Sequence, residues 1–347
     1  MAWSTVERAL DTVFRSPSDD LWIGFYGGEP LLAFDLVERT VEAAERRRPR
    51  DRELRFHVST NGLLLDERKG SFLAAHEVET QISFDGSREA QNLRAPGTYH
   101  RISERLRRLR RMLPDYYSRL VKVAVTVTPA AVPTLASAVD ELTGSGIESV
   151  DLAPAMLGAA GWTAGDEGEL ERQMDRIYES ALRLYEHTGR VPVTLFRRGP
   201  GRVVSTGNGQ MCGLTRPGTL TVDVDGEVNG CTTLARSYQT LSLPGLKRWV
   251  APLRIGPVDA PDLEARVQSF RSSVERSALF GEREKKHSAH GRCRECRYRG
   301  ECLICPAAIA RAGEDPHRVP DYLCAFSRVS LSYRERFPAQ ILSSPRP

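Results

Sequence analysis

The first 211 residues of this 347-residue chain contain no cysteine. All seven cysteines lie between Cys212 and Cys324, which indicates a dedicated cysteine site in the last part of the chain. The number of cysteines is odd, and no secretion signal precedes them, so a framework of disulfides is not expected. We therefore expect these thiols to belong to a reducing compartment.

Long hydrophobic runs are also missing. Residues 1–20 contain no apolar segment of the kind found in signal peptides. No apolar run in the chain approaches the ~20 residues that a membrane-spanning helix needs. These absences predict a soluble, cytoplasmic protein that has no membrane partner.

The charge of the chain is nearly balanced. The formal net charge of +4 is too small to indicate a nucleic-acid partner. The most basic stretch, residues 105–111, lies among apolar residues at helical spacing, which are Ile102, Leu106, Leu109 and Leu113. This pattern predicts a helix whose arginines form a solvated face.

The stretch Gly291–Cys305, which reads GRCRECRYRGECLIC, holds four cysteines in fifteen residues. They form two C-x-x-C pairs, Cys293/Cys296 and Cys302/Cys305, a spacing that lets two thiolates bind one metal ion or cluster. The arginines and glycines between the pairs cannot build a core, so the stretch indicates a loop folded around a bound group. Zinc and an iron–sulfur cluster both remain open on these residues alone, because each takes four thiolates.

The first half of the chain repeats a strand followed by a helix, which predicts a parallel sheet with right-handed crossovers. The expected strands are Trp22–Tyr26, Arg55–Ser59, Thr80–Phe84, Lys122–Thr128 and Ser149–Ala153. The expected helices between them are about Leu31–Arg48, Asp66–Ala75, His100–Leu113, Val132–Thr143 and Glu167–His187. Further on, Leu220–Val228 predicts a hairpin with a two-residue Asp225-Gly226 turn, and Glu264–Phe280 predicts an amphipathic helix.

Polar residues stand where several of these strands end. They are Glu29 after Gly27-Gly28, then Thr60-Asn61-Gly62, and then Ser83 with Asp85-Gly86. Because the carboxyl ends of parallel strands share one edge, and α/β barrels place their sites there, this edge is the expected binding face. An ordinary strand-to-helix turn is the alternative for Glu29 taken alone.

The cysteine array resembles the SPASM domain, which carries auxiliary iron–sulfur clusters at the C-terminus of many radical SAM enzymes. Thirteen residues separate Cys212 from Gly226, and four more separate Gly226 from Cys231. A C-x2-C-x5-C-x2-C stretch and Cys324 then follow, so all seven positions match, with one residue fewer before Cys305.

This resemblance implies two auxiliary [4Fe–4S] clusters. The first would be held by Cys293, Cys296, Cys302 and Cys324. The second would be held by Cys212, Cys231 and Cys305, with an open iron or a ligand other than cysteine. His287 and His290 are candidates for that missing ligand, although a solvated state is the alternative for both.

The first half extends the resemblance to the radical SAM family, on GGEP at Gly27–Pro30, STNG at Ser59–Gly62, SFDG at Ser83–Gly86, and Arg94 with Gly97. It implies that S-adenosylmethionine is bound by Gly27, Gly28, Glu29, Pro30, Ser59, Asn61, Ser83, Asp85 and Arg94. The implied activity is modification of a ribosomally made peptide or protein by hydrogen abstraction. Sulfatase-maturating relatives place an aspartate after the second cysteine of the array, where this chain has Thr232, so that activity loses support.

One departure from the family is large. Radical SAM enzymes carry C-x3-C-x2-C after their first barrel strand and before GGEP, and this chain has no such motif. We expect the first strand and its cluster loop to be missing, and binding of S-adenosylmethionine to be weak or absent. A truncated chain is one explanation, and a genuine pseudoenzyme is the other.

The expected fold is α/β: an incomplete radical-SAM-type (β/α)6 partial barrel over residues 1–190, followed by a SPASM domain over 212–335. Residues 191–211 are expected to be a linker and 336–347 a disordered tail. The resemblance implies two partners, a substrate peptide or protein and a low-potential electron donor of the flavodoxin or ferredoxin type. The alternatives are a non-catalytic iron–sulfur protein that binds a peptide or partner enzyme, and a zinc-stabilised binding module.

Overall fold

A computed structural model describes residues 1–155, 162–197, 214, 219–239, 249 and 254–338. Cys212 and most of the expected linker and tail lie outside these ranges. The chain divides into two compact units, and each is made of separate segments. The cysteine-bearing unit comprises residues 1–21, 43–53 and 203–324, and the sheet unit comprises residues 22–42, 54–202 and 325–347. These limits do not follow the linear boundaries expected from the sequence, which stay a prediction.

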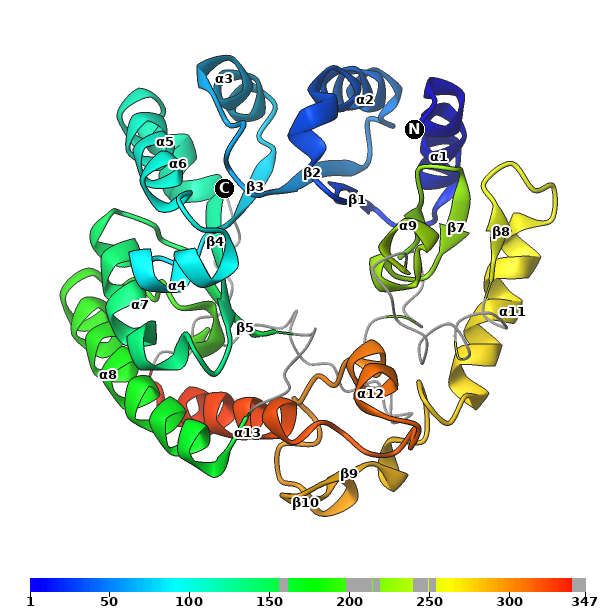
Figure 1. The fold of residues 1–347 in the computed structure, drawn as a ribbon. Helices are drawn as coiled ribbons and strands as arrows, with labels where there is room; N and C mark the ends of the chain where they lie inside the picture. Colours follow the sequence, from blue (N-terminus) through cyan, green and yellow to red (C-terminus); the bar gives the residue numbers. More distant parts are fainter. Residues whose placement is uncertain (156–161, 198–213, 215–218, 240–248, 250–253, 339–347) are drawn as a thin grey trace. The chain divides into compact units, whose positions relative to one another are not determined.

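The sheet unit is built on a five-stranded sheet in the order β1-β2-β3-β4-β5, with β2 to β5 paired in parallel (Figure 1). The strands are β1 (Asp20–Phe25), β2 (Glu53–Thr60), β3 (Glu79–Ser83), β4 (Val121–Val127) and β5 (Val150–Pro154). Every expected strand is present, with its ends within two residues of the prediction. The α/β fold class is therefore confirmed.

Helices α3, α5 and α7 lie along one side of this sheet in Figure 1. The expected helices are found as α2 (Phe34–Arg47), α3 (Glu67–Ala75), α5 (Tyr99–Met112), α7 (Leu135–Gly144) and α8 (Ala164–Thr188), and a further helix, α1 (Trp3–Arg15), precedes β1. Short 3-10 turns, η1 (Pro30–Ala33) and η2 (Val132–Thr134), precede α2 and α7. None of the helices in the described ranges is long and apolar enough to cross a bilayer.

Two helices of seven residues each, α4 (Arg88–Arg94) and α6 (Pro114–Leu120), were not predicted from the sequence. Seven residues make about two turns, which is too short for a clear apolar periodicity. Their starts were nevertheless visible in the sequence. Ser87 caps α4 by accepting a hydrogen bond from the Ala90 N–H, and Pro114 occupies the first position of α6.

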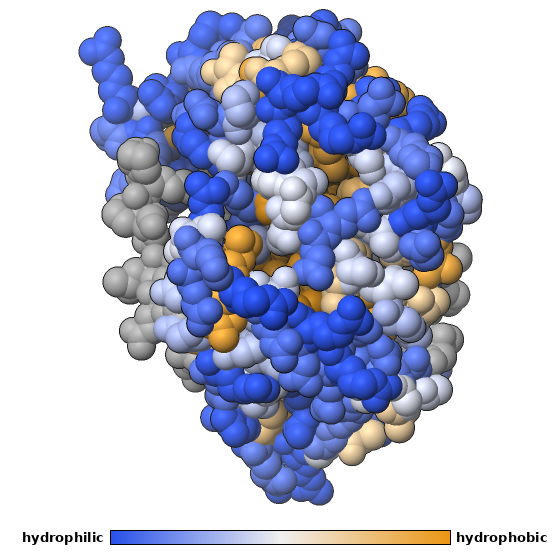
Figure 2. Space-filling view, turned by 90° about the vertical axis from the view of Figure 1, so that its left-hand side faces the viewer, coloured by the Kyte–Doolittle hydropathy of each residue, from blue (hydrophilic) through white to orange (hydrophobic). Residues whose placement is uncertain are grey.

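The basic helix behaves as expected. Ile102, Leu106 and Leu109 of α5 are buried, while Arg107 and Arg111 are exposed. The face of the molecule turned to the viewer in Figure 2 is mostly hydrophilic, with small and separate apolar spots. The solvated arginine face is therefore confirmed.

Strand β4 shows how the sheet acquires two different faces. Its valines, from Val121 to Val127, are buried at alternate positions, while Lys122, Ala124 and Thr126 between them are only half-buried. Successive side chains of a strand point to opposite faces, so one face is apolar and the other carries polar groups. The polar face is where the chemistry-bearing residues gather.

The last helix of the described chain, α13 (Asp321–Arg336), carries Cys324 in its first turn, and its later residues belong to the sheet unit. There Phe337 stacks on Phe196 with ring centroids 5.1 Å apart, and it meets the edge of Tyr178. The Tyr333 hydroxyl donates to Asp175 at 2.5 Å. These contacts dock the end of α13 on α8.

Between residues 221 and 312, the cysteine-bearing unit contains short strands, 3-10 turns and helices. They are β6 (Thr221–Val222), β7 (Glu227–Asn229), β8 (Gly256–Pro257), β9 (His287–Ser288), β10 (Gly291–Arg292), η6 (Thr232–Leu234), α9 (Arg236–Gln239), α11 (Leu263–Arg276), η8 (Arg283–Lys285), η9 (Cys293–Glu295) and α12 (Pro306–Ala312). The helix expected at Glu264–Phe280 is therefore present as α11, but it ends four residues earlier.

The expected hairpin is also present, but its turn was predicted wrongly. Val222 pairs with Val228, and the Asp223 N–H donates to the Glu227 carbonyl at 2.8 Å, so three residues form the loop instead of two. Gly226, the last of them, has a φ of +89°, which favours glycine. Asp225 accepts a hydrogen bond from the Glu227 N–H and is a turn residue, as expected.

Candidate functional site

At the carboxyl edge of the sheet, Glu29 joins two of the predicted motifs. Its carboxylate accepts hydrogen bonds from the Leu31 N–H at 3.0 Å, the Thr60 hydroxyl at 2.7 Å and the Asn61 N–H at 2.8 Å. The GGEP turn is thereby held against the end of β2. Thr60, whose role the sequence analysis missed, is 2% exposed and also accepts a hydrogen bond from the Gly62 N–H.

Asp85 and Arg94 form a second fixed pair at this edge. Arg94 Nε donates to Asp85 Oδ2 at 2.7 Å, and Nη2 donates to Oδ1 at 2.6 Å, which is a bidentate arrangement. Thr126 contacts both side chains: its N–H donates to Asp85 Oδ1 at 2.8 Å, and its hydroxyl oxygen accepts a hydrogen bond from Arg94 Nη2 at 2.5 Å. Within the described residues Arg94 Nη1 has no hydrogen-bond partner, so it can donate to a ligand carboxylate.

The remaining predicted side chains lie on the polar face or in the turns. Ser59 pairs in register with Gln81, and Ser83 pairs with Ala124, so both serines share the face of Thr126. Asn61 instead uses its side-chain oxygen to accept the Leu63 N–H at 2.9 Å, which shapes the turn. Gly27 has a φ of +148°, a backbone conformation that favours glycine.

Three charged or ionisable side chains, His57, Glu79 and Lys122, lie on the same face of the sheet as Ser59 and Ser83 and were not singled out from the sequence. Glu79 binds His57 Nδ1 at 3.3 Å and Lys122 Nζ at 2.6 Å. Burial by itself would raise the pKa of Glu79, but the hydrogen bonds and charges of His57 and Lys122 outweigh burial and lower the pKa to about 2. This cluster could have been predicted from the sequence, because charged residues occupy inward-facing positions of buried strands.

Glu79 should make the fold sensitive to acid. Its folded pKa lies below its unfolded value of 4.5, so its contribution is complete above pH 4.5 and is lost as the pH falls toward about 2. Glu79→Gln should cost about 1–3 kcal/mol at pH 7 and flatten the acid dependence of stability. Urea unfolding from pH 7 to pH 2 measures both effects.

Glu77→Gln is the matched control, because Glu77 pairs with Arg119 at an exposed site where its side chain is 70% exposed. An exposed pair of this kind contributes little. Equal losses in the two variants, or unchanged acid dependence in Glu79→Gln, would contradict the assignment.

Six of the seven cysteines lie in the described part of the chain, and all six are half-buried and form no disulfide there. They fall into two groups. Burial, then the negative charges of Cys302, Cys324 and Cys296, raises the pKa of the Cys293 thiol to about 11. Burial likewise raises the pKa of Cys305, whose neighbouring thiol is Cys231.

These neighbourhoods are looser than a closed metal cage. Among the described residues, no three histidine, cysteine or carboxylate side chains lie close enough together to hold a metal ion. A metal or cluster binds thiolates, so its positive charge would offset both the burial and the repulsion between thiols that raise these pKa values. Half-buried thiols that lie near one another and form no disulfide are suitable ligands for a metal ion or cluster. The grouping agrees with the ligand division implied by the resemblance, and that division remains a proposal.

Hydrogen bonds connect the segment before Cys293 to the start of the helix that carries Cys324, although 27 residues of chain separate Cys296 from Cys324. The His287 N–H donates to the His317 carbonyl at 2.9 Å, and the Val319 N–H donates to the His287 carbonyl at 2.8 Å. Asp321, in the first turn of α13, accepts the Ala289 N–H at 2.7 Å. The hairpin that leads into Cys293 is thereby fastened to the start of the helix that carries Cys324.

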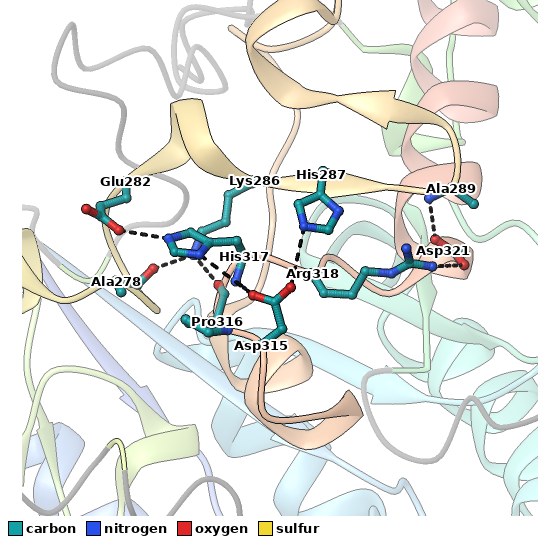
Figure 3. A network of polar contacts seen from close by, with 10 residues as sticks. All are labelled: Ala278, Glu282, Lys286, His287, Ala289, Asp315, Pro316, His317, Arg318 and Asp321. Carbon is teal, nitrogen blue, oxygen red and sulfur yellow. Dashed lines mark hydrogen bonds and ion pairs between the residues drawn. The ribbon is translucent and has the colours of Figure 1, made fainter.

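Two histidine side chains of this network also contact carboxylates (Figure 3). His317 Nε2 lies 2.8 Å from Glu282, and His287 Nε2 lies 3.4 Å from Asp315. His287 thus faces a carboxylate instead of being simply solvated, and this contact gives no support to its role as a cluster ligand. His317, whose backbone carbonyl accepts the His287 N–H, was not predicted from the sequence to take part in this network.

Lys286, in the same network, was missed as well. Its ammonium is fully buried and donates to the carbonyls of Ala278 at 2.6 Å, Leu279 at 3.0 Å and Pro316 at 2.5 Å (Figure 3). Burial lowers the pKa of Lys286 to about 8, with nearby negative charges opposing that effect. Nothing in the sequence separates this lysine from the exposed Lys285 beside it.

The fold and these two groups of residues define a protein with a parallel α/β sheet and a thiol-rich unit. No protein-family model matches the chain. Over 89 residues it is 34% identical to the cysteine-type anaerobic sulfatase-maturating enzyme of Clostridium perfringens, which covers 25% of this chain and 24% of that protein. Over 81 residues it is 27% identical to the radical SAM cyclopropyl synthase TigE of Paramaledivibacter caminithermalis, covering 23% and 16%. The chain thus matches at most about a quarter of the length of these curated relatives.

Solved structures extend the likeness over nearly the whole chain. The structure of native anSMEcpe with bound AdoMet and Kp18Cys peptide superposes with a TM-score of 0.70 at 16% identity, covering 97% of this chain and 89% of that one. Streptococcus suis SuiB bound to precursor peptide SuiA superposes with a TM-score of 0.58 at 11% identity, covering 93% and 69%. The chain therefore has the radical SAM fold. The likeness to radical SAM maturases that the motifs predicted is confirmed.

Proposed function

We propose that this chain is the barrel and auxiliary-cluster part of a radical SAM maturase that modifies a ribosomally made peptide or protein by hydrogen abstraction. The observation that carries the proposal is the presence of two features in one chain. The sheet edge presents Glu29 and Arg94 in fixed positions, and the other unit gathers thiols in two groups. The relatives named above act on proteins or are bound to peptides, which supports a peptide or protein substrate.

The sheet edge would bind S-adenosylmethionine. Gly27 to Pro30 form the turn that Glu29 ties to β2, and Arg94 keeps Nη1 for the ligand carboxylate. Ser59, Asn61, Ser83 and Asp85 complete the proposed site. When it is bound to a reduced iron–sulfur cluster, S-adenosylmethionine supplies the radical that removes hydrogen from the substrate.

The thiols would hold two auxiliary clusters. Cys293, Cys296, Cys302 and Cys324 would bind one [4Fe–4S] cluster, and Cys212, Cys231 and Cys305 would bind the other. Their proposed task is to hold the substrate or to take up the electron that the modified substrate releases. A low-potential donor of the flavodoxin or ferredoxin type would supply reducing electrons.

A second function is favoured by one observation. The 347 residues hold no cysteine before Cys212, so the thiolates of the cluster that cleaves S-adenosylmethionine are not among them. A non-catalytic iron–sulfur protein that binds a peptide or a partner enzyme would need none. The two proposed functions make different predictions: if a C-x3-C-x2-C segment is added at the sheet edge, the maturase should cleave S-adenosylmethionine and the non-catalytic protein should not.

Arg94 offers a test of the proposed cofactor site. Arg94→Gln removes a charged donor, and hydrogen bonds to charged groups contribute about 1.5–3 kcal/mol, so affinity should fall tenfold or more. Equilibrium dialysis of the anaerobic 347-residue chain with labelled S-adenosylmethionine measures this, and we expect weak binding by the unmodified chain. Arg88→Gln removes the same charge at the start of the same helix and should leave the affinity unchanged. Equal affinity of the Arg94 variant and the unmodified chain, with both folded, would contradict the site.

A further inference from the structure

Lys286 lies directly beside the cysteine group that contains Cys293. Its side chain is 0% exposed, and its own carbonyl accepts a hydrogen bond from the Cys293 N–H at 2.9 Å. Figure 3 shows the side chain running to the carbonyls of Ala278 and Pro316. Burial lowers the pKa of Lys286, and the negative charges of Glu282, Asp315 and, least of the three, Cys293 oppose that effect.

Among the residues that the structure describes, no carboxylate forms an ion pair with Lys286. Within the described residues its ammonium has three carbonyl oxygens as acceptors, and the carboxylates of Glu282 and Asp315 act on it only from a longer range. Glu282 already pairs with Lys285 at 2.6 Å and with His317, and Asp315 pairs with His287. A buried ammonium without a counter-charge is costly, so a nearby negative group is expected.

A second buried cation adds to the first. Arg283 is 5% exposed, and its Nη2 donates to the Cys302 carbonyl at 2.8 Å. Its charge lowers the pKa of Cys293, against the effect of burial and of the neighbouring thiolates. Two buried positive charges therefore stand beside the loops that carry Cys293 and Cys302.

We infer that Lys286, together with Arg283, supplies the positive charge that stabilises the reduced state of the cluster held by Cys293, Cys296, Cys302 and Cys324. The inference rests on the proposed iron–sulfur function of these cysteines. One-electron reduction adds one negative charge to the cluster, and a fixed cation in a poorly solvated site stabilises that added charge. Lys286 is not a ligand of the cluster, but its fixed positive charge makes the cluster easier to reduce and so raises its reduction potential.

A purely structural role makes a different prediction. The three carbonyl contacts of Lys286 also fasten residues 278–279 to Pro316, and this strap needs a donor but no charge. Lys286→Gln keeps an amide donor and removes the charge. If the strap alone matters, the variant should alter stability without moving the reduction potential.

The test is a dithionite titration of the anaerobically reconstituted full chain, followed by electron paramagnetic resonance. The signal to follow is the one that disappears in Cys324→Ala. Lys286→Gln should shift its midpoint potential to a more negative value. Lys285→Gln, which changes the net charge equally at a side chain that is 63% exposed, should leave the potential unchanged because solvent screens that charge.

An intact cluster with the same midpoint potential in Lys286→Gln as in the unmodified chain overturns the inference. If Lys286→Gln does not assemble the cluster, Arg283→Gln takes its place. A negative shift in that variant supports the inference, and an unchanged potential overturns it. Absence of iron from the unmodified chain would instead overturn the cluster proposal, and this inference with it.

Discussion

Reconstituted with iron and sulfide and reduced with dithionite, the 347-residue chain is expected to make no 5′-deoxyadenosine above background. Reductive cleavage of S-adenosylmethionine needs one electron per molecule, delivered while the amine and carboxylate of the ligand are held on an iron. Glu29, Ser83 and Arg94 can grip only the periphery of the ligand. The thiolates that would place an iron beside it are not among the residues before Cys212.

A fusion supplies the matched comparison. A strand and loop bearing C-x3-C-x2-C, joined ahead of Met1, should give 5′-deoxyadenosine under the same conditions, and a fusion with the three cysteines changed to alanine should not. Liquid chromatography with mass spectrometry measures the product. Clear turnover by the 347-residue chain alone would contradict the expectation. It would indicate the cluster of Cys212, Cys231 and Cys305 as the reactive centre, because three cysteines leave one iron without a thiolate.

Replacement of Cys324 by alanine should remove one cluster and spare the other. Cys324 stands in the first turn of α13, and the hydrogen bonds of His287 and Asp321 bring that turn to the hairpin before Cys293. Without it only three thiolates remain for the first cluster, so we expect about half of the iron and sulfide to be lost. Iron and sulfide assays and paramagnetic resonance of the reduced protein measure the loss.

Cys305→Ala is the reciprocal control, and it should remove the other cluster while leaving the signal that depends on Cys324. Equal loss of both clusters in either variant, with circular dichroism unchanged, would count against the division of ligands.

The strands of the sheet could be predicted because their pattern is local. The alternating valines of β4 and the polar residues after β2 and β3 fix both the strands and the edge at which a site forms. Ser83, Asp85 and Arg94 could be named from motifs for the same reason, since short, ordered spacings carry them.

What the sequence could not show depends on contacts between distant residues. Glu79 reaches His57 on one neighbouring strand and Lys122 on the other, so its low pKa arises only when the strands pair. Lys285 and Lys286 are adjacent residues of the same type, so the sequence does not tell which of them is buried. Only the path of residues 278–279 and 316 around one of them makes it buried.

The central claim is that the C-terminal cysteines hold two iron–sulfur clusters. Metal and sulfide analysis of the anaerobically reconstituted 347-residue chain, combined with Mössbauer spectroscopy, tests it most directly. The account predicts a brown protein with roughly eight iron and eight sulfide per chain, in two [4Fe–4S] clusters. A colourless protein with stoichiometric zinc and no iron would contradict it.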